Sequence, residues 1–313
     1  MMLSKHRYKI IHGDALERLR KFPSRSIDCV ITSPPYWQMR DYRWRGQWGL
    51  EKTYGEYLEK LWSLMDEIKR VLKKRGTVWI NLGDSYGTQS GSCRGKKYQQ
   101  SGKISHVENG RILLKGNVPQ KCLLLLPHRF AIGCIVRGWI LRNDIIWAKP
   151  NAMPESTKDR FSKKHEYIFL LVKSKKYFFD LNRVREQHKL CSLERMKRAW
   201  NGHREKRSSY ENMKIENMCH RRGKNPGDVS DFWRIHTQSG KEKHYAKFNT
   251  ELITKPILAG CPKNGIILDP FCGVGTTGIR TIELGRKFIG IEGKTAYCEI
   301  AEKNLRRVKI LSA

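Results

Sequence analysis

The segment 265–292, GIILDPFCGVGTTGIRTIELGRKFIGIE, constrains the fold more than any other part of this chain. The apolar run Ile266–Leu268 indicates a buried strand that delivers Asp269, and a Gly-rich turn then leads into a helix expected over 278–284. A second apolar run, KFIGIE, ends at Glu292. Because a helix that joins two buried strands forms a parallel βαβ unit, the sequence predicts an α/β fold.

The turn between these strands predicts a ligand site. Gly273 and Gly275 have no side chains, so the backbone and the N-terminus of the helix can approach a ligand closely. Glu292 lies about 20 residues further on, where dinucleotide-binding folds place a carboxylate on a ribose. The spacing is neither G-x-G-x-x-G nor G-x-x-x-x-G-K-S/T, so neither a pyrophosphate nor a triphosphate ligand is implied. The residues alone leave the identity of the ligand open.

The rest of the chain continues the alternation of strands and helices. Helical spacing of apolar residues begins at Thr53, and Gly76 is expected to end that helix. The segment 165–180 resembles a β-hairpin that turns at 173–175. Further strands are expected at 8–11, 27–32, 77–84 and 139–149, with helices around Leu16 and Leu19 and over 121–138 and 250–261. A chain of 313 residues with this pattern suits one elaborated α/β domain.

The stretch 28–42, DCVITSPPYWQMRDY, ends a buried strand in an unusual way. Pro34 and Pro35 cannot donate ladder hydrogen bonds and their φ angles are fixed, so the chain after Thr32 leaves the sheet as a rigid loop. An aromatic pair, Tyr36 and Trp37, stands at the tip of this loop. The alternative is a simple strand-terminating turn whose aromatic residues pack in the core.

The charge of the chain points to a polyanionic partner. The sequence carries 62 Lys and Arg residues against 30 Asp and Glu residues, a formal net charge of +32. Such an excess attracts polyanions through long-range steering and counterion release. Heat-adapted proteins are also rich in Lys, but they normally carry Glu to match, which this chain does not. Nucleic acid is therefore the expected partner.

Two segments interrupt the regular pattern. Residues 87–118 have little periodicity and indicate a long mobile loop. Residues 183–247 are dense in Arg, Lys, Asn and Ser with isolated aromatic residues, which favours an inserted segment that faces a polyanion. The nine cysteines form no C-x-x-C pair, so no metal site or disulfide framework is expected. Without an apolar signal or membrane-spanning run, the chain is expected to be soluble and cytoplasmic.

Two motifs together carry a family resemblance. D-P-F-x-G-x-G-T-T at 269–277 and T-S-P-P-Y at 32–36 resemble the β group of S-adenosylmethionine-dependent amino-methyltransferases, in which the catalytic loop precedes the cofactor loop. The S-P-P-Y form most resembles the DNA cytosine-N4 methyltransferases of restriction-modification systems and phages. The resemblance implies a doubly wound, mostly parallel, Rossmann-like sheet with an antiparallel edge strand. S-adenosylmethionine would lie across the carboxyl ends of the strands.

The resemblance also implies the organisation of the chain. It covers most of the sequence and lapses only in the loop at 87–118 and in the basic segment. Residues 1–182 would form the catalytic half of one domain, 183–247 a basic insertion for target recognition, and 248–313 the cofactor-binding half. Asn249 replaces a usual proline, and the continuation EGKTAYCEIA after the last strand also departs from the family pattern.

By this resemblance, two sets of residues form the site. Asp269 would fix the turn or meet the cofactor's amino group, and Glu292 would accept the ribose hydroxyls. Asp14 matches an acid that approaches the adenine, with a helix N-cap as the alternative; Phe248 would close the pocket, with an ordinary core contact as its alternative. The catalytic set is Ser33, Pro34, Pro35 and Tyr36, and the cofactor set is Asp14, Phe248, Asp269, Phe271, Gly273, Gly275, Thr276 and Glu292.

The chemistry of amine methylation explains the rigid loop. An exocyclic amine is conjugated with its ring and is a poor nucleophile, so it must be held in line with the methyl sulfonium. The Ser33 hydroxyl and the Pro34 carbonyl can accept hydrogen bonds from the amine, and the prolines place no competing N–H beside it. Tyr36 offers a face on which an extruded base can stack.

Several alternatives follow from the same residues. Ring-carbon methylation needs a cysteine nucleophile in a Pro-Cys pair, and this chain has only Cys261-Pro262, in reversed order. Adenine-N6 methylation usually goes with Asp or Asn in the first position of the loop, so Ser33 favours cytosine N4. Structured or ribosomal RNA is an alternative substrate to DNA. A non-catalytic binding module would be expected to have a damaged loop, and both loops are intact.

Overall fold

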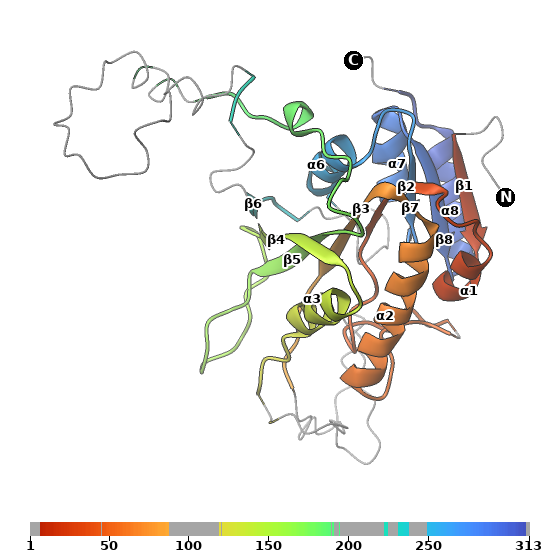
Figure 1. Ribbon diagram of the computed structural model, residues 1–313. Helices are drawn as coiled ribbons and strands as arrows, with labels where there is room; N and C mark the ends of the chain where they lie inside the picture. The colour runs from red at the N-terminus through yellow and green to blue at the C-terminus, as the bar shows by residue number, and fades with distance from the viewer. Residues whose placement is uncertain are drawn as a thin grey trace.

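The computed structural model describes residues 7–44, 46–87, 119, 121–188, 190, 194, 222–224, 231–237 and 249–310. Within these residues eight strands form one sheet, in the order β1-β8-β7-β2-β3-β5-β4-β6 (Figure 1). The strands are β1 (Tyr8–His12), β2 (Ile27–Thr32), β3 (Leu72–Leu82), β4 (Ile140–Ala148), β5 (His165–Val172), β6 (Phe232–Arg234), β7 (Ile266–Asp269) and β8 (Lys287–Glu292). The predicted α/β fold is confirmed.

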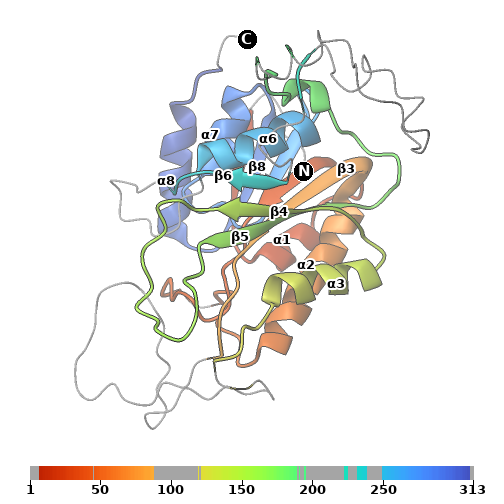
Figure 2. The same cartoon turned by 90° about the vertical axis from the view of Figure 1, so that its left-hand side faces the viewer.

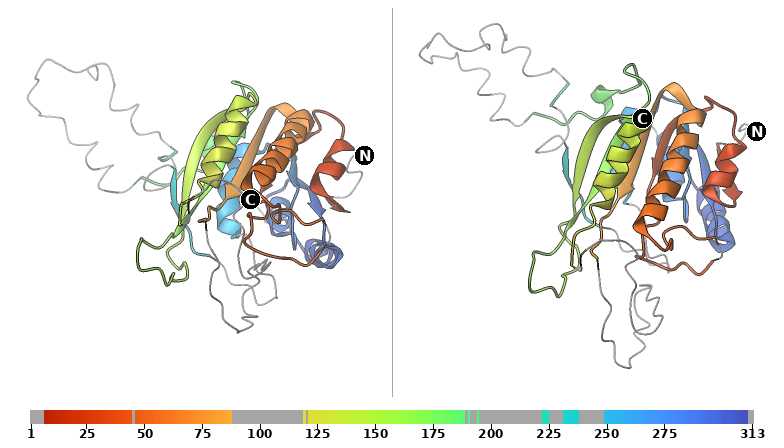
Figure 3. Two further views of the ribbon diagram at one scale, coloured as in Figure 1. Left: turned by 90° about the horizontal axis from the view of Figure 1, so that it is seen from below. Right: turned by 60° about the horizontal axis from the view of Figure 1, so that its bottom comes forward.

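Helices cover both faces of the sheet, as a doubly wound fold requires. The helices are α1 (Ala15–Arg20), α2 (Tyr54–Val71), α3 (Leu126–Val136), α6 (Thr250–Gly260), α7 (Thr276–Glu283) and α8 (Thr295–Arg306), and a short 3-10 turn covers Leu181–Arg183. The helix α2 packs between α1 and α3 on one face (Figure 3), and α7 packs between α6 and α8 on the other (Figure 2). This is the doubly wound, Rossmann-like arrangement that the family resemblance implies.

The antiparallel strand does not lie where the resemblance placed it. Every neighbouring pair in the sheet is parallel except those that involve β5, which runs antiparallel to both β3 and β4. The expected antiparallel edge strand is therefore an interior strand, and the edge is formed by β6. An interior strand is covered on both faces, which explains the continuous apolar run from Ile168 to Val172.

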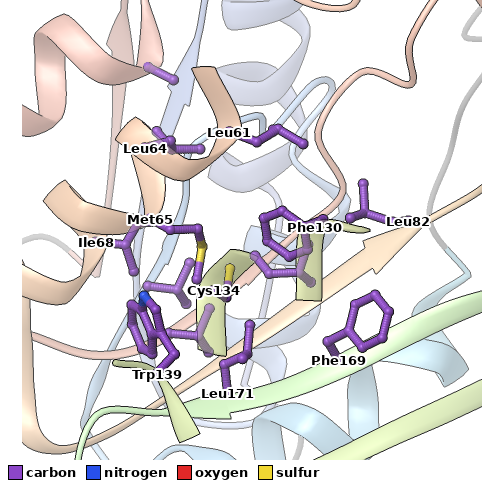
Figure 4. Packing of buried hydrophobic residues seen from close by; sticks show 14 of the residues in the cluster. Leu61, Leu64, Met65, Ile68, Leu82, Phe130, Cys134, Trp139, Phe169 and Leu171 are labelled. Atoms are coloured by element: carbon purple, nitrogen blue, oxygen red, sulfur yellow. The ribbon is translucent and has the colours of Figure 1, made fainter. Parts of the chain in front are cut away.

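The core lies between the sheet and its two helical layers. On the α1–α3 face, apolar side chains of α2 and α3 interlock with the inner side chains of β3 and β5 (Figure 4). A second cluster joins the opposite side chains of β2, β3 and β5 to α6. Because both faces of the central strands are buried, the strand ends are held rigidly, and loops leaving those ends have fixed origins.

Two boundaries differ from the sequence prediction. The helix α2 begins where the helical spacing was predicted, with Thr53 as its N-cap and Glu56 completing a capping box, but it ends at Val71. Gly76 therefore lies inside β3 and does not end the helix. A Cβ at Gly76 would lie 2.6 Å from the Leu72 side chain and 2.8 Å from the Asp28 carbonyl oxygen, so glycine serves the close approach of β2 and β3.

The predicted hairpin at 165–180 is wrong in its second half. After β5 the chain turns at 173–176, and Phe178 and Asp180 make single backbone bonds, to Arg75 and Ala259. Because β3 and β4 occupy both edges of β5, no edge is free for a following strand. The helix predicted over 121–138 is also shorter, since it begins at Leu126 with a proline in its first turn.

The predicted basic insertion contributes to the sheet. Phe232–Arg234 form the edge strand β6, which runs parallel to β4. This part of the segment 183–247 therefore belongs to the main sheet. Most of the segment 183–247, and residues 88–118 of the loop predicted at 87–118, lie outside the described residues. In the described ranges no helix is both long and apolar enough to span a membrane.

Candidate active site at the carboxyl end of the sheet

The two sequence motifs meet at the centre of the sheet. β2 and β7 are neighbours, but β2 leads through α2 to β3 on one side while β7 leads through α7 to β8 on the other. Open α/β sheets bind ligands at such a reversal point. Thr32 ends β2, Asp269 ends β7, and the Thr32 hydroxyl donates to Asp269 Oδ1 at 2.6 Å. This bond joins the catalytic loop to the cofactor turn.

Asp269 organises the Gly-rich turn. Its Oδ1 also accepts the Phe271 backbone N–H at 3.1 Å, and its Oδ2 accepts the Thr277 hydroxyl at 2.7 Å. The side chain is only 1% exposed, and this burial raises the pKa of Asp269 to about 6. Of the two roles that the sequence left open, the geometry is that of a residue that fixes the turn.

The glycines have the geometry that the turn requires. Gly273 has a φ of +52° and Gly275 a φ of +85°, both in the left-handed region that favours glycine. A Cβ at Gly275 would lie 3.2 Å from the Ala301 Cβ, so α8 also restricts this position. Thr276, the first residue of α7, is buried directly behind the turn. At both glycines, therefore, the turn carries no side chain beside the N-terminus of α7.

Glu292 closes the other side of the turn. Its two carboxylate oxygens accept backbone N–H groups, from Gly273 at 2.9 Å and from Lys294 at 2.8 Å. Burial raises the pKa of Glu292, although these hydrogen bonds oppose the shift. The carboxylate that the sequence placed after the second strand thus contacts the Gly-rich turn directly.

Asp14 caps the helix α1, which is the role that the sequence allowed besides a contact with the adenine. Its Oδ1 accepts the backbone N–H groups of Leu16 and Glu17, which confirms the N-cap of α1. Its Oδ2 accepts the Trp48 indole N–H at 2.6 Å. The Trp48 ring, which is 1% exposed, packs edge-on against Phe271 with ring centroids 5.1 Å apart. Trp48 therefore links Asp14 to the cofactor turn.

The donor and acceptor groups at this edge fit S-adenosylmethionine. Asp14, Glu292 and Asp269 follow or end β1, β8 and β7, which are consecutive in the sheet. Asp14 and Glu292 are half-buried carboxylates that suit the hydroxyl and amine donors of such a ligand, while Asp269 is buried and holds the turn between them. Phe248, the remaining predicted cofactor residue, lies outside the described residues.

The S-P-P-Y loop is anchored to α2 through Pro35. Pro34 is buried and Ser33 is half-buried, and the Tyr57 hydroxyl of α2 donates to the Pro35 carbonyl oxygen at 3.0 Å. Among the described residues no donor reaches the Pro34 carbonyl oxygen. The loop is therefore fixed through Pro35, while the Pro34 acceptor stays available.

A buried polar network lies beneath this loop. The Tyr36 hydroxyl donates to Glu166 Oε2 at 2.7 Å, and Asn81 Nδ2 donates to the same oxygen at 2.8 Å and to the Tyr36 hydroxyl oxygen at 2.7 Å. Lys149 pairs with the other oxygen of Glu166. The Ser33 hydroxyl donates to the Tyr36 hydroxyl oxygen at a longer 3.4 Å. Residues of β3, β5 and the end of β4 thus hold the catalytic loop.

The network sets the charge state of its members. Burial would raise the pKa of Glu166, but the Lys149 ammonium and the hydrogen bonds from Lys149, Asn81 and Tyr36 outweigh it and lower the pKa. Burial, reinforced by the Glu166 charge, raises the pKa of Tyr36 well above its usual value. Glu166 is therefore an anion and Tyr36 a neutral hydroxyl at physiological pH.

Sequence reasoning missed Trp48, Asn81, Lys149 and Glu166. Each lies outside the two motifs and reaches the site through the fold. A signal was present for two of them, since Asn81 and Glu166 interrupt otherwise apolar runs, WINL and HEYIFLLV. A polar side chain within a buried strand needs a partner, which marks it for attention.

Comparison with known proteins agrees with this geometry. Residues 27–303 match the N6/N4 methyltransferase family model, described as DNA methylase. The chain is 36% identical over 297 residues to the Type II methyltransferase M.Cfr9I of Citrobacter freundii, covering 95% of this chain and 87% of that protein. It is 35% identical to the Type II methyltransferase M.SmaI of Serratia marcescens, covering 96% and 91%.

A solved structure shares the fold. The PvuII DNA methyltransferase, described as cytosine-N4-specific, superposes with a TM-score of 0.63 at 19% identity, covering 98% of this chain and 89% of that one. The family match spans both the catalytic loop and the cofactor turn. The chain therefore belongs to the DNA methylase family of N6- and N4-type amino-methyltransferases, which take their methyl group from S-adenosylmethionine.

Proposed function

We propose that this DNA methyltransferase modifies the exocyclic N4 amine of cytosine. The observation that carries the proposal is the pair of acceptors at the start of the S-P-P-Y loop, the Ser33 hydroxyl and the unclaimed Pro34 carbonyl oxygen. They stand at the end of β2, beside the β7 end that carries the cofactor turn. A base amine placed between them would face the methyl donor.

The polar network beneath the loop sets the direction of the Ser33 hydrogen bonds. The Ser33 hydroxyl donates to the Tyr36 oxygen and accepts from Asn81 Nδ2 at 3.4 Å, so its second lone pair is left to accept from an amine. Neither Pro34 nor Pro35 brings an N–H group that would compete as a donor. Two acceptors orient both amine protons away from the methyl donor and leave the nitrogen lone pair to attack it in line.

Direct transfer agrees with the state of the nearby cysteine. Cys272, which lies in the cofactor turn, is 6% exposed, and burial raises the pKa of its thiol well above the usual value. A thiol of this kind is not available as the thiolate nucleophile of ring-carbon methylation. The amine nitrogen would form the new bond to the methyl carbon as the methyl–sulfur bond breaks. The neutral thioether would leave, and one amine proton would be released to solvent.

The choice of cytosine over adenine rests on Ser33. In the family resemblance, Asp or Asn in the first position of the loop goes with adenine and Ser with cytosine. The PvuII enzyme, which shares this fold, is described as cytosine-N4-specific. We also propose that the segment 183–247 reads the target sequence, because its Arg, Lys, Asn and Gln side chains suit phosphate and base-edge contacts.

Methylated plasmid DNA tests the base directly. The chain is expressed in cells without DNA methyltransferases of their own, and the recovered plasmid is digested to nucleosides for mass spectrometry. N4-methyl-deoxycytidine is expected with the wild type. In vitro, Ser33→Ala should lower turnover roughly 100-fold, as loss of one preorganised contact does, with cofactor binding unchanged in calorimetry. N6-methyl-deoxyadenosine in place of the cytosine product would overturn the assignment.

A further inference from the structure

The loop between β4 and β5 shares an edge with the active site. Because β4 runs parallel to β2 and β5 runs antiparallel to it, residues 149–164 leave and re-enter the sheet at its carboxyl end. This loop and the segment that follows β2 project from the same end of the sheet (Figures 1 and 2). Glu166, just after the loop, contacts Tyr36.

The loop presents two large apolar side chains to solvent. Phe161 is 98% exposed and Met153 is 86% exposed. A single exposed apolar residue is ordinary on a protein surface, so exposure alone decides nothing. The position of Phe161 is more informative, because Phe161 lies five positions before Glu166 and an extended chain of that length spans at most about 17 Å. Phe161 is therefore within reach of a DNA strand whose base occupies the catalytic loop.

Several contacts hold this loop in place without involving the Phe161 side chain. Arg160 stacks over the Tyr86 ring at 3.8 Å, pairs with Glu155 at 2.6 Å and donates to the Phe161 carbonyl oxygen at 3.0 Å. Asp159 pairs with Lys121 at 2.6 Å. On the other side of the ring, Lys163 donates to the Asp84 carbonyl oxygen. The chain is thus held on both sides of the exposed ring, which favours presentation of the ring to a partner.

The charge of the loop identifies the class of partner. Residues 149–164 contain five Lys or Arg residues against two acidic residues. Lys158 and Lys164 are exposed, and within the described ranges neither forms a salt bridge. Such a loop suits duplex DNA, because its cationic side chains can contact the phosphates on the outside of the duplex while its apolar side chain contacts the stacked bases inside.

We propose that Phe161 inserts into the base stack of duplex DNA beside the target nucleotide. A base that is methylated inside a protein pocket must leave the duplex, and its departure opens a gap that costs stacking energy. An apolar wedge fills such a gap, as aromatic and aliphatic side chains do in other DNA-bending proteins. The proposal rests on base extrusion from DNA and holds for either target base.

The test compares a paired with a mismatched target. A duplex that carries the recognition site, mapped from methylated plasmid, is made with the target base either paired or mismatched. Phe161→Ala should lower kcat/KM on the paired duplex by roughly five- to 150-fold, the range expected for one lost base–aromatic stack. The loss should be much smaller on the mismatched duplex, in which the base is already unpaired. Phe161→Leu, which keeps an apolar wedge, should recover most of the activity.

Controls separate insertion from general damage. Val136→Ala alters another exposed apolar side chain, 81% exposed on α3, and should leave both substrates unaffected. Cofactor binding by Phe161→Ala should equal that of the wild type in calorimetry. Equal losses on paired and mismatched duplexes, or no loss on either, would overturn the proposal. If the modified base were adenine, the cytosine assignment would fail while this comparison remained valid.

Discussion

Replacing Glu166 by Gln tests whether a buried ion pair holds the catalytic loop. The Glu166 side chain is 14% exposed and its partner Lys149 is 17% exposed, so neither charge is well solvated. Gln removes the anion and leaves the Lys149 ammonium without compensation. Breaking one side of a buried pair costs about 3–5 kcal/mol, and the partial exposure here favours the lower end, about 3 kcal/mol of unfolding free energy.

The same change should disturb catalysis through Tyr36. Without the carboxylate, the Tyr36 hydroxyl and Asn81 lose a charged acceptor at 2.7 and 2.8 Å, and the loop that carries Ser33 loses its anchor. A shift of about 1 Å in a reacting group costs about 100-fold in rate. We expect turnover to fall by about that factor, while cofactor affinity, which depends on the β7 and β8 ends, is retained.

A double variant distinguishes positioning from proton transfer. Glu166→Gln with Lys149→Met removes both charges, and the Gln carbonyl can still accept from Tyr36. Urea denaturation should then show most of the lost stability restored, and methyl-transfer kinetics should recover with it. A double variant that is stable but still inactive would refute the positioning role and point to Glu166 as a chemical base. An unchanged single variant would refute the account of the network altogether.

Further predictions concern the strand ends. Because burial raises the pKa of Asp269 from 3.8 to about 6, its stabilising contribution is present below about 3.8 and is lost as the pH rises through about 6. Between pH 4 and pH 8, Asp269→Asn should therefore gain about 2 kcal/mol of unfolding free energy relative to the wild type in cofactor-free urea titrations; a constant difference would contradict the pKa. Tyr36→Phe keeps the ring but removes the hydroxyl beneath Ser33, so single-turnover rates should fall while DNA affinity stays within about twofold; loss of DNA affinity instead would show that the hydroxyl acts in binding. Thr32→Val removes the hydrogen bond between the two loops and should lower the unfolding free energy by about 1 kcal/mol, with weaker cofactor binding in calorimetry. A variant with unchanged stability and cofactor affinity would show that this bond does not link the catalytic loop to the cofactor turn.

The sequence predicted the two loops because each is a contiguous motif. The strand ends that carry them, at Thr32 and Asp269, were placed correctly since apolar runs followed by Pro or Gly mark such ends clearly. Their adjacency was not evident from periodicity, because 237 positions separate the two residues in the chain. The family resemblance supplied that step, and the sheet order explains it physically.

The network beneath the loop could not be predicted from the sequence. Glu166 reaches Tyr36 only because β5 is inserted antiparallel between β3 and β4, and strand order is a property of long-range pairing. The same insertion explains why the predicted hairpin after β5 failed. Gly76 was misassigned for a related reason, since its role is a close contact with Leu72 and β2 that no local pattern reveals.

The measurement that tests the central claim most directly is nucleoside mass spectrometry with methyl-deuterated S-adenosylmethionine. The purified chain is incubated separately with genomic DNA and with unmodified ribosomal RNA, and each digest is searched for the label. The structure and the Ser33 loop predict label in N4-methyl-deoxycytidine from DNA. Label in N6-methyl-deoxyadenosine would contradict the role given to Ser33, and label confined to cytidine of the RNA would contradict the assignment of DNA as substrate.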